Sequence, residues 1–135
     1  MKAIGKTIIT LVALWAAFGS YIFDMSPSHM FNQLWPPHAK YHNAQTMLLG
    51  TAIGLLSIWV LWFRDGNKVG NLQLAVILAS VYWLTQLGSI IFPGTALFDP
   101  EFAPPGNLPV QLIMDGALLV LLGIAYTVAY KNIED

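Results

Sequence analysis

The most regular feature of the chain is the alternation of four long apolar stretches with shorter polar segments. The stretches cover approximately residues 4–23, 42–63, 71–92 and 108–130. Each has about 20 residues, which at about 1.5 Å of helical rise per residue is enough to cross a hydrocarbon core of about 30 Å. The pattern therefore predicts an all-α fold, a transmembrane four-helix bundle that forms a single domain over residues 1–135.

The composition strengthens the prediction of a membrane protein. Only 10% of the residues are charged and 56% are hydrophobic, whereas soluble domains have about a quarter charged residues. The formal net charge is −1, so no basic surface is available to attract nucleic acid. The chain has no cysteine, which excludes disulfides, Cys-ligated zinc and iron–sulfur clusters. The expected partner is the lipid bilayer.

The basic residues predict the orientation in the membrane. Five of the six flank the same ends of the spans, namely Lys2, Lys6, Arg64, Lys68 and Lys131. Only Lys40 lies at the opposite ends. Because basic residues are enriched on the cytoplasmic side of helical membrane proteins, we expect both termini to be cytoplasmic. The two Pro-rich connections, 24–41 and 93–107, are then outside.

Polar side chains are concentrated near the outer ends of the predicted helices. His38, His42 and Gln45 follow one another at i, i+4 and i+7 and therefore share one face of the second helix. We expect this face to meet polar residues of the other helices and of the first outer loop around one pocket that opens outward, since polar groups in hydrocarbon need partners. The expected ligand-binding residues are His38, Gln45, Gln86, Gln111, Asn32 and Trp35.

Asp115 is the only acidic residue deep within a predicted span. A carboxylate there is costly and indicates a functional site by default, with His42 and Gln86 as its expected partners. In one interpretation Asp115 and His42 form a catalytic pair that exchanges a proton with a substrate. In the other, Asp115 is a hydrogen-bonded packing residue that joins the second, third and fourth helices.

Two further motifs have more than one interpretation. Histidines at i and i+4 can share a metal ion, so His38 and His42 are candidate metal ligands, with His29 as a third candidate. No cofactor is assigned. Gly50 and Gly54 form a small-residue face that allows close helix contact, either within the chain or between two copies.

The run from Trp35 to Gln45, WPPHAKYHNAQ, resembles a signature of the form WPPHAxxHNxQ found in a family of small bacterial four-helix membrane proteins. The resemblance implies a bacterial inner-membrane location and no known activity. The expected layout of four helices with an outer polar pocket is also distantly similar to DoxX-like and EXPERA proteins. This second similarity is one of architecture, so no catalytic residue follows from it.

These observations lead to three hypotheses of function. The first is a membrane protein that binds a small lipophilic molecule (a quinone, isoprenoid or sterol-like lipid) in the outer pocket and, if Asp115 and His42 meet, isomerises or cyclises it. The second is a non-enzymatic accessory subunit that packs against another membrane protein, or a homo-oligomer. The third is the histidine-based metal site.

Overall fold

The computed structural model describes residues 3–103 and 105–134, so Lys2 lies outside the described residues. Four long helices form it: α1 (Ile4–Asp24), α2 (Pro37–Trp62), α3 (Lys68–Gly88) and α4 (Val110–Glu134). Three short 3-10 helices lie between α3 and α4: η1 (Ser89–Ile91), η2 (Pro100–Phe102) and η3 (Pro105–Asn107). All four long helices are long and apolar enough to cross a membrane, which confirms the predicted all-α, four-helix architecture.

Two helices begin before their apolar stretches, and local signals explain why. Pro37 is the first residue of α2, a position where proline is tolerated because no helical N–H is needed there. Asn67 precedes α3, and its side-chain oxygen accepts hydrogen bonds from the backbone N–H groups of Val69 and Gly70. The polar first turns of both helices therefore extend beyond the apolar core.

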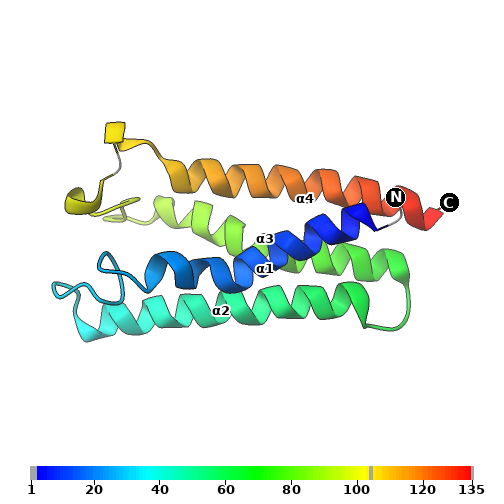
Figure 1. Ribbon diagram of the computed structural model, residues 1–135, viewed down its shortest axis with the longest axis horizontal. Helices are drawn as coiled ribbons and strands as arrows, with labels where there is room; N and C mark the ends of the chain where they lie inside the picture. Colours follow the sequence, from blue (N-terminus) through cyan, green and yellow to red (C-terminus); the bar gives the residue numbers. More distant parts are fainter. Residues whose placement is uncertain (1–2, 104, 135) are drawn as a thin grey trace.

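The helices run antiparallel, as Figure 1 shows. Both ends of the chain and the short turn after α2 lie at one end of the bundle, here called the terminal end. The connections 25–36 and 89–109 lie together at the other end, the loop end. Helices α1 and α3 each pack against both α2 and α4 and also touch each other, whereas in the described ranges α2 and α4 make no contact. The interior is thus organised around α1 and α3.

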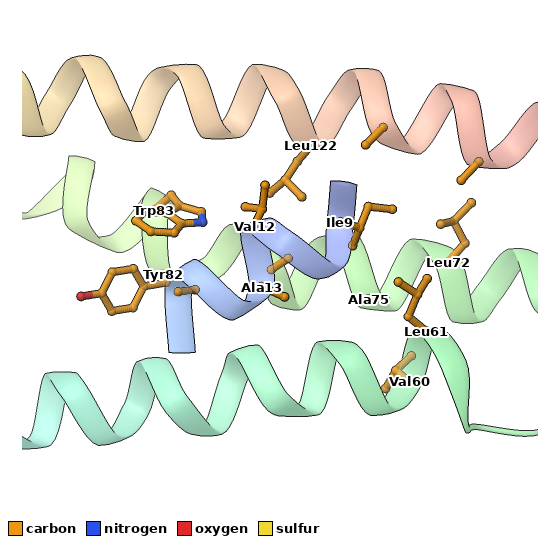
Figure 2. Close-up of a cluster of buried hydrophobic side chains, with 14 residues drawn as sticks. Ile9, Val12, Ala13, Val60, Leu61, Leu72, Ala75, Tyr82, Trp83 and Leu122 are labelled. Carbon is orange, nitrogen blue, oxygen red and sulfur yellow. The ribbon is translucent and has the colours of Figure 1, made fainter. Parts of the chain in front are cut away.

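The core below the loop end is apolar and built from many small residues (Figure 2). A Cβ atom placed on Gly50 would lie 2.6 Å from the backbone oxygen of Ala16. One on Gly54 would collide with the backbone oxygen of Ala13. The two glycines therefore let α1 and α2 approach closely, so the small-residue face serves packing within the chain.

Large apolar side chains are exposed on the outside of the bundle, among them Leu11, Leu48, Ile77 and Val120 from the four helices in turn. In water such an extended apolar exterior would be unfavourable, whereas in a bilayer it faces lipid chains. The exterior agrees with an integral membrane protein.

Candidate functional site

A cavity of about 440 Å³ lies at the loop end, between α1, α3, α4 and the connection that covers them. Its walls are mainly apolar and aromatic. The large aromatic members come from α1, α3 and the second connection: Trp15, Phe23, Tyr82, Trp83, Phe98 and Phe102. Proline and the short 3-10 helices of the 89–109 connection place Phe98 and Phe102 over the helix ends.

A small set of polar side chains also lines the cavity. Ser20 and Asp24 come from the last turns of α1, and Ser28 and His29 come from the loop that follows it. Tyr82 and Gln86 of α3 and Gln111 of α4 complete the set. The structure thus brings Gln86 and Gln111 together, as the sequence predicted, with polar residues of the α1 end and of the first loop.

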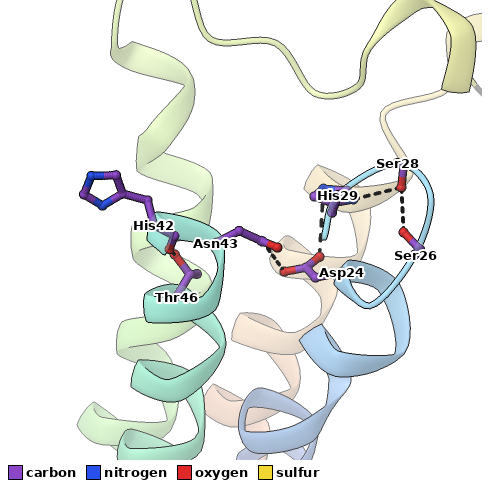
Figure 3. A network of polar contacts seen from close by, with 7 residues as sticks. All are labelled: Asp24, Ser26, Ser28, His29, His42, Asn43 and Thr46. Carbon is purple, nitrogen blue, oxygen red and sulfur yellow. Dashed lines mark hydrogen bonds and ion pairs between the residues drawn. The ribbon is translucent and has the colours of Figure 1, made fainter. Parts of the chain in front are cut away.

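The polar face of α2 does not join this cavity. His38, His42 and Gln45 do share one face as predicted, with the two Nε2 atoms 3.0 Å apart and His42 Nδ1 3.1 Å from Gln45 Oε1. All three side chains are exposed, and Figure 3 shows His42 directed away from Asp24. The expectation that all four helices would contribute these residues to one pocket is not met.

The reason lies in the packing of α2. Its buried stripe runs through Met47, Gly50 and Gly54, which α1 contacts closely. One turn earlier, the same stripe brings Asn43 toward α1, where its Nδ2 donates to Asp24 Oδ2 at 2.9 Å. The histidine face is therefore rotated out of the bundle, because the glycine face is required for the α1 contact.

Asp115 is fully buried, with a relative exposure of 0%. Among the residues that the structure describes, neither of its carboxylate oxygens has a hydrogen-bond partner. The expected partner His42 points out of the bundle, and Gln86 Oε1 is itself buried without a described partner. Asp115 therefore forms neither the predicted pair with His42 nor a hydrogen-bonded link between helices. It lies one helical turn beyond Gln111, next to the cavity-lining Met114.

Asn32 and Trp35, the two expected ligand-binding residues of the first loop, are not among the residues that line the cavity. Asn32 is buried, and its Oδ1 accepts a hydrogen bond of 2.8 Å from the backbone N–H of Leu34. Trp35 packs edge-on against His29, with the ring centroids 5.2 Å apart. Both residues shape the loop that presents His29.

Asp24 and His29 are the cavity residues whose joint placement sequence reasoning missed. His29 Nε2 lies 3.9 Å from Asp24 Oδ1 (Figure 3). The loop returns over the end of α1 because Met30 N–H donates to the backbone oxygen of Asp24 at 3.0 Å. One signal was present: Asp24 is the last residue of α1, where the helix dipole disfavours a negative charge. An acidic residue at that position suggests a role other than helix stabilisation.

The fold does not bring His29 to His38 and His42 as a third metal ligand. His38 and His42 are adjacent, but His29 pairs with Asp24 at the cavity. Across residues 3–103 and 105–134 there is no group of three or more His, Cys, Asp or Glu side chains that could hold a metal ion.

The fold and the cavity together define a protein with four helices that are long and apolar enough to cross a membrane, and with a partly polar pocket at one end of the bundle. Residues 8–134 match DUF6640, a family of unknown function, and the chain belongs to this family. No curated protein and no solved structure matches the chain.

Proposed function

We propose that the protein is an integral membrane protein that binds a small lipophilic molecule with a polar head group in the loop-end cavity. A quinone, an isoprenoid or a sterol-like lipid has this character. The volume of about 440 Å³ falls in the range of small-molecule sites, which are typically mostly apolar with a few polar groups that orient the ligand.

The observation that carries the proposal is an unpaired polar atom at the cavity. Gln86 Oε1 belongs to a cavity-lining residue, is buried, and has no hydrogen-bond partner within the described part of the chain. Buried polar groups nearly always have partners, and an unpaired one is costly. A ligand head group that hydrogen-bonds this atom would remove that cost.

The proposal is for binding rather than for isomerisation or cyclisation. The predicted catalytic pair is separated, because Asp115 is buried within the bundle and His42 is exposed on α2. General acid–base catalysis requires both groups within hydrogen-bond reach of the substrate.

Photo-cross-linking with benzophenone, a neutral aromatic probe, tests the proposal. In protein reconstituted into lipid nanodiscs, we expect cross-links on the segments that line the cavity, mapped by peptide mass spectrometry. Val110 lines the cavity, and Val110→Trp should abolish most of this labelling by occupying the space with an indole. Val120 is a matched control, since it lies on the same helix with similar exposure but does not line the cavity. Equal labelling in both variants would contradict the proposal.

We further propose that the terminal end faces the cytoplasm of a bacterial inner membrane. Four described basic residues support this orientation: Lys6, Arg64, Lys68 and Lys131. Because the chain has no cysteine, single substitutions give a clean test. A membrane-impermeant maleimide should label Ser28→Cys in intact spheroplasts and label Asp65→Cys only after lysis. The reverse pattern would invert the assignment.

A further inference from the structure

The end of α1 holds a connected set of polar side chains at the mouth of the cavity, here called the Asp24–His29 site. Asn43 Nδ2 donates to Asp24 Oδ2 at 2.9 Å. On the other side, His29 Nδ1 and Ser28 Oγ are hydrogen-bonded at 2.8 Å, and Ser28 Oγ is hydrogen-bonded to Ser26 Oγ at 2.8 Å (Figure 3). Asp24 Oδ1 and His29 Nε2 take part in none of these bonds.

The site is held in place from several directions. His29 N–H donates to the backbone oxygen of Ser26 at 3.1 Å, and Asn32 N–H donates to that of His29 at 2.9 Å. The indole of Trp35 packs against the imidazole ring. The position of Nε2 relative to Asp24 is therefore set by the fold of the loop before any ligand arrives, which lowers the entropic cost of binding.

The distance between the two remaining atoms is informative. His29 Nε2 and Asp24 Oδ1 are 3.9 Å apart, which is too long for a direct hydrogen bond. One oxygen atom about 2.8 Å from each of them would complete a triangle with normal hydrogen-bond lengths. If Ser28 donates to Nδ1, Nε2 carries the ring proton, so it can donate to such an oxygen while Asp24 accepts from it.

We propose that the Asp24–His29 site binds the hydroxyl group of a lipophilic alcohol or phenol, whose apolar part occupies the aromatic cavity. A hydroxyl group matches the two atoms because it donates one hydrogen bond, to Asp24 Oδ1, and accepts another, from His29 Nε2. A carbonyl or ether oxygen only accepts, and would leave the carboxylate oxygen without a donor.

The solvent exposure of the two side chains agrees with this role. The His29 side chain is 38% exposed and that of Asp24 17%, so the site lies at the cavity mouth, with the carboxylate the more enclosed of the two. The apolar wall formed by Trp15 and Phe23 begins at the same end of α1. A bound alcohol would place its hydroxyl at the mouth and its hydrocarbon part against these rings.

This inference rests on the proposed binding function, and a pair of probes separates the two. Para-(hydroxymethyl)benzophenone and para-ethylbenzophenone have nearly the same shape and differ in a hydroxyl against a methyl group. We expect half-maximal cavity labelling of the wild-type protein at about a tenfold lower concentration of the hydroxymethyl probe, as one or two net hydrogen bonds predict. The ethyl probe should still label the cavity.

Two variants should remove the preference for the hydroxymethyl probe. His29→Phe retains an aromatic ring against Trp35 but lacks the Nε2 donor. In Asp24→Asn, the bond from Asn43 holds the amide oxygen in place of Oδ2, so an NH₂ group replaces the acceptor that faces the ligand. His42→Phe is the matched control, because it makes the same change at an exposed histidine of α2 and should keep the preference.

The outcomes distinguish the two proposals. Equal labelling of the wild-type cavity by both probes overturns the hydroxyl site and leaves the binding function standing. Cavity labelling by neither probe overturns the binding function and this inference with it. A preference that persists in both His29→Phe and Asp24→Asn also overturns the hydroxyl site. If His29→Phe loses its helical circular dichroism, the result with Asp24→Asn decides.

Discussion

The two halves of the bundle differ in whether their buried polar side chains have hydrogen-bond partners. Toward the terminal end they are paired: Ser57 Oγ donates to the backbone oxygen of Ala75 at 2.8 Å, and Asn71 Nδ2 donates to that of Arg64 at 2.7 Å. Toward the loop end, Gln86 and Asp115 have buried polar atoms with no hydrogen-bond partner in the described residues. The terminal half is thus built for stability, whereas the loop half leaves polar groups available.

The closeness of helix packing also differs between the two halves. A Cβ atom on Gly5, near the terminal end of α1, would lie 2.6 Å from the backbone oxygen of Ala125 and 2.6 Å from the backbone nitrogen of Ala129. One on Gly19, near the loop end of the same helix, would have the ring of Trp15 as its nearest neighbour, at 3.2 Å. Backbone atoms cannot move aside, but a side chain beside a cavity can. Hollow space and unpaired polar atoms therefore occur in the same half.

The largest expected effect is that of Gly5→Ala. The new methyl group meets the backbone of α4, so α1 and α4 must separate, and we expect a loss of about 3 kcal/mol in the free energy of unfolding. Gly19→Ala should cost less than about 1 kcal/mol, since Trp15 can shift toward the cavity. Unfolding in mixed micelles followed by circular dichroism measures both. Similar losses would remove the distinction between the two halves.

Asp115→Leu tests the energetic cost of an unpaired polar group in the loop half. Leucine has the branching of aspartate without its polar atoms, so it removes the cost of a buried, unpaired carboxyl group. We expect the free energy of unfolding to rise by about 2 kcal/mol. The same unfolding assay tests this expectation. A clear loss of stability would contradict the expectation that the buried carboxyl group destabilises the folded protein.

Ser57→Ala probes a paired group of the terminal half. It removes the bond between α2 and α3 and leaves the Ala75 oxygen with its helical partner, so we expect a loss of about 1 kcal/mol. Thr85→Ala is the control, since Thr85 bonds only within its own helix, to Val81 and Tyr82; its effect should stay below about 0.5 kcal/mol. Equal effects would show that the interhelical bond contributes nothing of its own.

The smallest effect is expected for His42→Phe. His42 is exposed and contacts only residues of α2 through its ring, so the free energy of unfolding should change by less than about 0.5 kcal/mol. Benzophenone labelling of the cavity should stay at the wild-type level. A loss of labelling would show that His42 contributes to the cavity and would contradict the assignment of the cavity to α1, α3 and α4.

The sequence alone determined the features that depend on local periodicity and helix length. The four helices and the common face of His38, His42 and Gln45 were predicted. These features follow from the apolar length needed to cross a bilayer and from the period of the α-helix. None of them requires knowledge of a neighbouring helix.

The tertiary structure decided which face of each helix turns inward. Rotation about a helix axis depends on contacts with other helices, and for α2 the close approach of Gly50 and Gly54 to α1 places Asn43 inside and His42 outside. The meeting of Asp24 and His29 depends on a loop that returns over the end of α1. Helical periodicity does not extend across such a loop. The proximity of Asp24 and His29 therefore could not be predicted from the sequence pattern.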